Sequence, residues 1–457
     1  MDILFDIHNS HLEDPSRFAE RDPQLHRLQL LPYRYVPALL QQFPTNIPGI
    51  YTLGGGRQIG KTTLLKQWMQ QLLHQGVQPA AIVFLSGEMI DDQHSLLRIL
   101  RSQLDTMPVT GIKYILLDEV SYIRDWDKAV KYAADSGLLD QVILMLTGSD
   151  LVLMQEARMR FPGRRGQADQ VDFHLYPLSF RETVILKRAN TPALESAKND
   201  QMVLALPMLY EEFEQYLIHG GYLTAINDYA TNNKITAATL MTYSDWVRGD
   251  MLKRGKHEHY LREILSAIIK RYMTQVSWNA LARDLSIDHP KTVADYIALL
   301  ESMDAVFVQA ALLEDKLCAA PKKARKVMFA DPFIFHAISA WLQSQQGRFV
   351  DQIAETLKKP EICAALVESI VVTHYRRFYQ TYYIKAEGEV DVAYIDNGQF
   401  WPVEIKWRGQ LHTKDLKQIL KYPNGKILTR FHESRMIGHL PAEPLPWALW
   451  KMDHPLH

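Results

Sequence analysis

Residues 49–63 of the chain read Gly-Ile-Tyr-Thr-Leu-Gly-Gly-Gly-Arg-Gln-Ile-Gly-Lys-Thr-Thr. Gly55, Gly60, Lys61 and Thr62 satisfy the pattern G-x-x-x-x-G-K-[ST]. An apolar run that suits a buried strand precedes the glycines, and a helix-forming run without glycine or proline follows them. Backbone N–H groups of such a loop, together with the positive end of the helix dipole, bind a polyphosphate. The stretch therefore predicts a nucleotide phosphate-binding loop, and the alternative is a glycine-rich turn before an ordinary helix.

Two polar residues of this loop have specific predicted tasks. The ammonium of Lys61 reaches the β- and γ-phosphates, and the hydroxyl of Thr62 binds Mg²⁺. We therefore expect ATP and Mg²⁺ as the cofactors. The predicted ATP-binding residues are Gly55, Gly56, Arg57, Gln58, Ile59, Gly60, Lys61, Thr62 and Thr63.

Length and composition narrow the class of protein. A chain of 457 residues has room for roughly two to four domains, and its 47% apolar and 23% charged residues are typical of a soluble globular protein. A net charge of −1 excludes a global field that attracts nucleic acid, so any DNA-binding surface is a local patch. Two cysteines, Cys318 and Cys363, exclude a disulfide framework. No apolar run approaches the ~18 residues of a membrane span, and the N-terminus lacks a signal-peptide pattern. We expect a cytoplasmic protein with no membrane partner.

Apolar strand candidates alternate with helical stretches between residues 49 and about 190. This alternation predicts βαβ units and a parallel sheet. Helical periodicity dominates from about 195 to 320, and strand signals return from about 365 to 430. The predicted fold class is α/β, with a mostly helical middle segment and a second, small α/β unit. The strand candidates of the first sheet are Ile50–Leu53, Ala81–Leu85, Tyr114–Leu117, Val142–Leu146 and Val171–Leu175.

An apolar run, residues 114–117, ends in the two acids Asp118 and Glu119. At the carboxyl end of a strand beside the phosphate loop, Asp118 is predicted to hold Mg²⁺ and Glu119 to polarise the attacking water. A further strand ends in Thr147-Gly148-Ser149-Asp150. Ser149 or Thr147 is a candidate sensor of the γ-phosphate, with Ser149 as the catalytic candidate. The alternative for these two residues is a simple loop.

Phosphoryl transfer also needs a cation near the developing charge. Four arginines follow the strand that ends at Thr147, within a short stretch that contains Pro162-Gly163. We select Arg164 as the catalytic arginine finger, supplied in cis or by a neighbouring subunit, so an oligomer is possible. The alternative is a solvated basic loop. The four arginines are Arg158, Arg160, Arg164 and Arg165.

These motifs resemble the AAA-type ATPases of prokaryotes that carry a C-terminal DUF4143 domain. The resemblance also includes Phe161-Pro-Gly-Arg-Arg-Gly, Tyr176-Pro-Leu-Ser-Phe-Arg-Glu and Gly220-Gly221-Tyr222, although Leu223 stands where that family usually has proline. It implies that Lys61, Thr62 and the two acids bind and hydrolyse ATP. It says little about the purpose of the hydrolysis.

The middle of the chain contains two short amphipathic stretches, 276–285 and 290–300, separated by a polar turn. This pattern predicts a helix-turn-helix, and the strand-like residues 305–310 that follow suggest a winged version. Such a module binds DNA or serves as a protein contact or lid. A basic cluster nearby is typical of a solvated face. It comprises Lys322, Lys323, Arg325 and Lys326.

Near the C-terminus, two strand candidates, 389–395 and 399–406, flank Asp396-Asn397-Gly398. If Asn397-Gly398 is a two-residue hairpin turn, Asp391 lies directly opposite Glu404. Like charges so close repel each other unless a cation sits between them. The period of two places Lys406 on the same face as Glu404. A bulge at Pro402 is the alternative, and it would shift this pairing by one residue.

The arrangement Asp391…Glu404-x-Lys406 resembles the PD-(D/E)xK nuclease superfamily. In that superfamily the acids bind Mg²⁺, which activates a water, and the lysine stabilises developing charge. Glu368 matches the acid of the preceding helix. Gln418 and Tyr422 match the Gln-x-x-x-Tyr of the following helix. The resemblance implies a nuclease-like domain, which either cleaves DNA or is an inert scaffold.

The sequence thus predicts an ATPase coupled to a nuclease-like, DNA-associated domain. The alternative is an ATP-driven signalling or scaffold switch whose C-terminal domain binds a protein partner. The expected segments are a lead-in that packs on the ATPase (1–48), the AAA-type core (49–195), a helical lid (196–255), a winged-helix-like domain (256–320) and the nuclease-like domain (321–457).

Overall fold

The computed structural model describes residues 7–148, 159–188, 202–287, 289–344, 352–409, 411 and 413–452. Three residues of the sequence predictions lie outside the described residues: Ser149, Asp150 and Arg158. The chain divides into two compact units, Met1–Tyr176 and Pro177–His457. The finer division into five segments stays a prediction.

The first unit is built on a five-stranded sheet in which every neighbouring pair of strands is parallel. The order β2-β3-β4-β1-β5 places the loop-bearing strand β1 between β4 and β5. All five predicted strands are confirmed within a few residues. Their bounds are β1 Gly49–Gly54, β2 Ile82–Ser86, β3 Lys113–Asp118, β4 Val142–Thr147 and β5 Asp172–His174.

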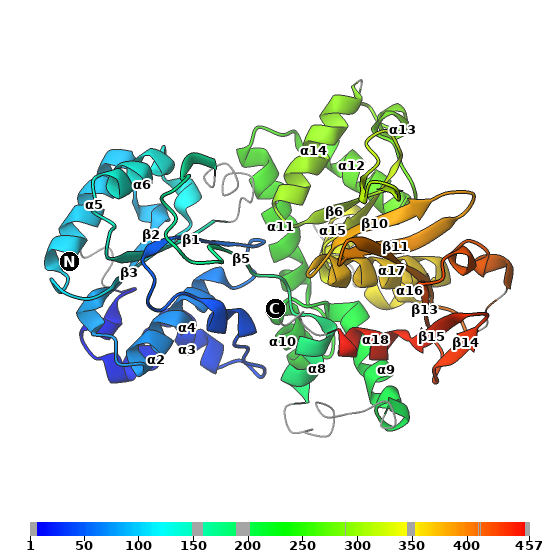
Figure 1. The fold of residues 1–457 in the computed structure, drawn as a ribbon, viewed down its shortest axis with the longest axis horizontal. Helices are drawn as coiled ribbons and strands as arrows, with labels where there is room; N and C mark the ends of the chain where they lie inside the picture. The colour runs from blue at the N-terminus through cyan, green and yellow to red at the C-terminus, as the bar shows by residue number, and fades with distance from the viewer. Residues whose placement is uncertain are drawn as a thin grey trace. The chain divides into compact units, whose positions relative to one another are not determined.

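Helices cover both faces of this sheet (Figure 1). Alternate residues of β3 point to opposite faces of the sheet. Ile115 and Leu117 pack with α5 and α6 on one face. Tyr114 and Leu116 pack with α4 on the other face. A strand that is apolar on both faces needs cover on both faces, which gives three layers. The helices of the unit are α2 Phe18–Arg21, α3 Pro23–Gln29, α4 Lys61–His74, α5 Gln93–Thr106 and α6 Trp126–Asp135, with 3₁₀ turns η1 Ser10–Leu12, η2 Pro15–Arg17, η3 Ala38–Gln42, η4 Pro79–Ala81, η5 Gly87–Met89 and η6 Val120–Tyr122.

The segment before β1 packs against α4 and the edge strand β2. The side-chain amide of Asn9 donates to the carbonyl of Phe84 at 2.9 Å and accepts from its N–H at 2.8 Å, so it completes the edge of β2. Lys66 of α4 forms an ion pair with Asp22 at 3.1 Å. Both of these side chains are 0% exposed. The lead-in is therefore tied to the helix that follows the phosphate loop.

The second unit begins with helices and continues into a six-stranded mixed sheet of order β10-β11-β12-β13-β15-β14. Two strands, β6 and β9, form a separate antiparallel pair after α13 and α14. Its helices are α8 Phe180–Lys187, α9 Met202–His219, α10 Leu223–Asn232, α11 Ala237–Lys253, α12 Glu258–Lys270, α13 Trp278–Arg283, α14 Pro290–Ser302, α15 Pro332–Gln343, α16 Ile353–Leu357, α17 Pro360–Arg376 and α18 Leu445–Lys451. Its strands are β6 Val306–Ala310, β7 Leu312–Leu313, β8 Cys318–Ala319, β9 Arg325–Phe329, β10 Gln380–Lys385, β11 Glu389–Asp396, β12 Gln399–Lys406, β13 Lys426–Thr429, β14 Arg435–Ile437 and β15 Leu440–Pro444.

The predicted middle helices are present as α13 and α14. Val293, Ile297 and Leu300 of α14 are buried, whereas Lys291 and Asp295 are exposed, as the sequence pattern predicts. The antiparallel pair of β6 and β9 follows them in the chain. These elements occur in the order of a winged helix, and that interpretation stays a prediction.

The predicted hairpin of β11 and β12 is confirmed. Asp396 pairs with Gln399, and the register continues without a shift to Val392 and Val403. Asn397 and Gly398 have φ values of 48° and 73°, which the two-residue turn requires. Pro402 pairs with Ala393, so the alternative of a bulge at Pro402 is wrong. Helix α17 lies against β10 and β11 (Figure 1).

One predicted helix, that of Gln418 and Tyr422, is wrong. The residues after β12 form the 3₁₀ turns η9 Thr413–Leu416 and η10 Ile419–Lys421, and Gln418 precedes the second turn. Pro423 and Gly425 follow the second turn, and both residues disfavour its continuation as an α-helix. No helix among the described residues is both long and apolar enough to cross a membrane.

Candidate functional site

The phosphate loop connects β1 to the first residue of α4. Gly55 has φ 144°, and a Cβ there would lie 2.6 Å from the carbonyl oxygen of Leu175, so only glycine fits. Gly60 has φ 104° and precedes the helix directly. These two positions explain the glycines of the motif by backbone conformation. They leave the N-terminal N–H groups of α4 directed at the loop, where an anion binds.

Lys61 is buried at the start of α4. Its ammonium donates to the carbonyl oxygens of Gly55 and Gly56 at 3.1 and 3.0 Å, and it lies 3.7 Å from Oε1 of Glu119. The loop therefore holds a cation at the position that the sequence predicts for phosphate binding. A polyphosphate offers the same ammonium stronger, charged acceptors.

Asp118, at the end of β3, receives two hydroxyl groups. Thr62 donates to Oδ2 at 2.6 Å, and Thr147 donates to Oδ1 at 2.5 Å. The strands β3 and β4 are neighbours, which brings Asp118 and Thr147 together at the same edge of the sheet. Hydroxyl and carboxylate oxygens are the ligands that Mg²⁺ prefers. Thr62 and Asp118 therefore fit the predicted metal site.

Glu119 adopts left-handed backbone angles, φ 53° and ψ 53°. This conformation is unfavourable for a residue with a side chain, and such outliers gather at functional sites. The backbone N–H of Glu119 donates to Oγ1 of Thr147 at 2.9 Å. Thr147 thus fixes both acids through one hydroxyl. Of the two sensor candidates, Thr147 lies at the site, and Ser149 lies outside the described residues.

The described arginines after β4 form ion pairs in this unit. Arg164 binds Asp135 through two nitrogen atoms, and its Nη1 donates to the carbonyl of Pro162 at 3.1 Å. Arg165 binds Asp172 of the edge strand β5, and Arg160 binds Asp127. The role of Arg164 as an arginine finger therefore stays a prediction. To act as an arginine finger, Arg164 would have to leave Asp135 and bind a phosphate.

The second unit contains a cavity of about 540 Å³ lined by acids of α17, β11 and β12. Glu404 and Lys406 are in contact, and the ammonium of Lys406 lies 3.9 Å from Oδ2 of Asp391. Oδ2 of Asp391 also accepts from the N–H of Ile405 at 2.8 Å. The hairpin thus brings together the three predicted residues. The ammonium of Lys406 offsets the repulsion between the carboxylates of Asp391 and Glu404.

Glu368 of α17 lines the same cavity, as the sequence predicts. Its carboxylate binds the ammonium of Lys326 at 2.7 Å, and Lys326 also contacts Glu389. Lys326 is 1% exposed, so the prediction of a solvated basic face is wrong for this member of the cluster. Sequence reasoning missed Lys326 and Glu389. The period of two from Asp391 could have found Glu389, whereas no local signal marks Lys326.

Burial shifts the protonation of these acids. Desolvation, together with the charge of Asp391, raises the pKa of Glu404 to about 8. Desolvation also raises the pKa of Glu368 to about 7. The pKa of Lys326 is raised above its usual range, because the surrounding carboxylates outweigh its burial. Carboxylate oxygens of Glu368, Glu389 and Asp391 lie within 4.8 Å of one another, a spacing that suits a hard divalent cation.

The structure places Gln418 and Tyr422 elsewhere, because neither is among the described residues that line the acidic cavity. Oε1 of Gln418 accepts from the N–H of Gly388 at 3.0 Å, and its Nε2 donates to the hydroxyl of Tyr422 at 3.2 Å. Tyr422 donates to Glu314 at 3.0 Å. The pair therefore holds the turn between β10 and β11.

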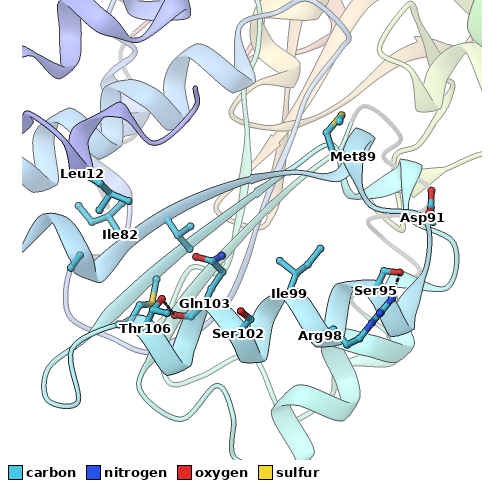
Figure 2. Close-up of a pocket in the computed structure, with 13 residues that line it drawn as sticks. Leu12, Ile82, Met89, Asp91, Ser95, Arg98, Ile99, Ser102, Gln103 and Thr106 are labelled. Carbon is cyan, nitrogen blue, oxygen red and sulfur yellow. Dashed lines mark hydrogen bonds between the residues drawn. The ribbon is translucent and has the colours of Figure 1, made fainter. Parts of the chain in front are cut away.

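A further cavity, of about 670 Å³, lies between α5 and the edge strand β2 (Figure 2). Leu12, Ile82 and Ile99 contribute apolar side chains to it, and Arg98 donates to Ser95 at 3.2 Å. None of the predicted site residues lines the described wall of this cavity. It offers no convergent set of reactive groups.

Comparison with known proteins supports an AAA domain in the first unit. Residues 48–184 match the family model AAA_14, described as an AAA domain. Residues 210–345 match DUF8612, a domain of unknown function, so the resemblance to DUF4143 is not shown. An uncharacterized protein of Haemophilus influenzae is 25% identical over 282 residues, which are 59% of this chain and 63% of that protein. This chain therefore spans less than two thirds of that relative.

The solved structures that the chain matches include a Walker-type ATPase of Pyrococcus abyssi. The identity is 14%, 71% of this chain and 95% of that chain are covered, and the TM-score is 0.42. Thermotoga maritima RuvB has 18% identity, 61% and 84% coverage and a TM-score of 0.29. Aeropyrum pernix Orc1, in complex with DNA, has 14% identity, 71% and 92% coverage and a TM-score of 0.31. Such values do not indicate a shared function. The family match and the loop, strand order and acids described above identify residues 48–184 as an AAA-type P-loop ATPase domain.

Proposed function

We propose that this protein is a Mg²⁺-dependent ATPase whose second unit carries a metal-dependent, nuclease-like site that acts on DNA. The observation that carries the first part is the pair of hydroxyl groups, from Thr62 and Thr147, on the carboxylate of Asp118. It joins the phosphate loop, the metal ligand and the neighbouring strand end in one site.

Each residue then has a defined task. Lys61 exchanges the loop carbonyls for phosphate oxygens, and Thr62 and Asp118 hold Mg²⁺. The metal, when bound, neutralises charge on the β- and γ-phosphates. Glu119 orients the attacking water and accepts its proton. Thr147 keeps both acids in position. Arg164, if it acts from a neighbouring subunit, makes turnover per subunit rise with protein concentration.

Phosphate release tests the proposal. Replacing a general base lowers turnover by about 10²–10⁴-fold, so Glu119→Gln should bind ATP and hydrolyse it at least a hundredfold more slowly. Lys61→Ala should lose ATP binding. Equal, near-background rates for the wild type and Glu119→Gln would contradict the assignment of Glu119.

The second part rests on the cavity that holds Asp391, Glu404 and Lys406, with Glu368 from the preceding helix. Carboxylates suit Mg²⁺ or Mn²⁺, and an adjacent lysine suits a developing phosphate charge. Nicking of supercoiled DNA with either metal is the expected activity. Asp391→Ala and Lys406→Ala should abolish it, and Glu387→Gln, an exposed acid paired with Lys421, should not.

An alternative is an ATP-driven switch whose second unit is inert and binds a protein partner. One observation favours it: Lys326 and Lys406 already form ion pairs with Glu368, Glu389 and Glu404. Absence of nicking with both metals, together with ATP-dependent protection from limited proteolysis, would support the switch. Stimulation of ATP turnover by DNA would support the nuclease-like assignment.

A further inference from the structure

Lys326 binds two acids of this cavity, Glu368 and Glu389, although it belongs to another sheet. It lies on β9, directly across from Gln309 of β6. The buried side chain of Gln309 donates to the backbone carbonyls of Tyr382 and Asp391 at 2.9 and 3.0 Å. These bonds fix the β6–β9 pair to β10 and β11. They place the ammonium of Lys326 between Glu368 and Glu389.

Two of the carboxylates that suit a metal, Glu368 and Glu389, also bind Lys326. Glu368, Glu389 and Asp391 offer carboxylate oxygens within 4.8 Å of one another. Glu389 and Asp391 are two residues apart on β11, so they face the same side. A divalent cation bound there would share the carboxylates of Glu368 and Glu389 with Lys326. The lysine and the metal therefore compete for Glu368 and Glu389.

A second observation points to a ligand in this cavity. Glu404 is 3% exposed and lines the same space, and its Oε2 has no hydrogen-bond partner among the described residues. A buried polar atom of this kind normally has a partner. The carboxyl groups also outnumber the cations, since six acids line the cavity whereas Lys406 and Arg408 of its wall and Lys326 supply three positive charges.

We propose that Glu368, Glu389 and Asp391 form a divalent-cation site in which Lys326 is the resident cation until the metal displaces it. This inference rests on the proposed nuclease-like site and adds two residues to it, Glu389 as a metal ligand and Lys326 as the competitor. The ammonium of Lys326 also lies 5.4 Å from the centre of the Tyr383 ring, a cation–π contact beside the two ion pairs. Metal loading is thereby coupled to the position of the β6–β9 pair.

Mn²⁺ binding to the full chain, without nucleotide or DNA, tests the proposal. An Asp118→Asn background removes the metal ligand of the first unit. Lys326→Met should bind Mn²⁺ about tenfold more tightly or better, because a nearby positive charge is removed. Lys326→Arg keeps the charge and should bind no more tightly than the wild type. Glu389→Gln should bind about tenfold more weakly or worse, and the exposed Glu387→Gln should bind like the wild type.

The rise in melting temperature on addition of Mn²⁺ gives a second readout, because it remains interpretable if Lys326→Met lowers stability. The rise should be larger for Lys326→Met than for the wild type. An unchanged or weaker affinity in Lys326→Met overturns the proposal, as does an unchanged affinity in Glu389→Gln. Tighter Mn²⁺ binding without any DNA nicking supports the cation site and removes the nuclease. DNA nicking, together with Mn²⁺ affinities that neither Lys326→Met nor Glu389→Gln changes, supports the nuclease and overturns this inference.

Discussion

The hydroxyl of Thr147 lies 2.5 Å from Oδ1 of Asp118 and donates a hydrogen bond to that carboxylate. The hydroxyl oxygen of Thr147 also accepts a hydrogen bond from the backbone N–H of Glu119 at 2.9 Å. One side chain on β4 therefore sets the positions of both acids at the end of β3. Neither of these two hydrogen bonds of Thr147 involves the phosphate loop.

Thr147→Val removes both of these bonds at nearly constant volume. We expect ATP turnover to fall by about 10–100-fold, the usual effect of losing a residue that orients a metal ligand. ATP affinity should change little, because the loop and Lys61 make the phosphate contacts. Phosphate release and binding of a fluorescent ATP analogue measure the two effects. Thr147→Ser keeps the hydroxyl and should restore turnover; a wild-type rate in Thr147→Val would show that Thr147 does not position the acids.

The buried ion pair of Lys66 and Asp22 predicts a large effect on stability. Lys66→Met leaves a buried carboxylate without its partner, which costs about 3–5 kcal/mol. The melting temperature of the first unit, recognised by its rise on addition of ATP, should fall accordingly. Asp22 also accepts the N–H groups of Gln24 and Leu25.

The matched variant combines Lys66→Met with Asp22→Asn. Asparagine still caps the helix and removes the unpaired charge, so most of the lost stability should return. If the double variant melts no higher than Lys66→Met alone, then the pair is not the cause of the loss.

Gly220 predicts a second effect on stability. Its φ is +58°, and a Cβ there would lie 1.8 Å from Oδ1 of Asp331. Gly220→Ala should destabilise the second unit by more than the ~1–2 kcal/mol of the left-handed conformation alone. Gly249→Ala is the control, because α11 leaves that position open. Alanine gains up to about 1 kcal/mol there, so an equal loss of melting temperature in both variants would refute the explanation.

Two buried histidines of the second unit predict sensitivity to acid. Desolvation lowers the pKa of His219 and of His374 to about 3. His374 accepts the N–H of Phe180 through Nε2 at 2.9 Å, so it is neutral in the folded chain. Since the unfolded pKa is about 6.5, stability is fully present above pH 6.5 and is lost as pH falls toward 3.

Between pH 6.5 and 5, each histidine should contribute a loss of roughly 2 kcal/mol. Melting curves of the second unit between pH 7.5 and 5 measure this loss. His374→Gln should melt lower at pH 7.5 and show a shallower decline with acid. The same slope in wild type and variant would mean that His374 does not carry the effect.

The sequence alone determined the strand, loop and helix of the predicted nucleotide site and the C-terminal hairpin. Both depend on residues close together in the chain: a strand, a glycine loop and a helix in one case, and strands around Asn397-Gly398 in the other. Local patterns of this kind fix the backbone, so the five strands, the loop and the contact of Glu404 with Lys406 were predictable. Glu389 lies on the same face of β11 as Asp391 through the period of two, although it is not part of the Asp…Glu-x-Lys motif.

Only the tertiary structure decided the contacts between distant segments. Lys326 meets Glu368 because a separate pair of strands docks through Gln309, and Lys66 meets Asp22 because the lead-in folds back on α4. The same limit explains the error at Gln418, whose side chain serves the turn at Gly388 instead of a helix. Charge and spacing in a sequence predict a solvated lysine, whereas burial among carboxylates depends on which sheets pack together.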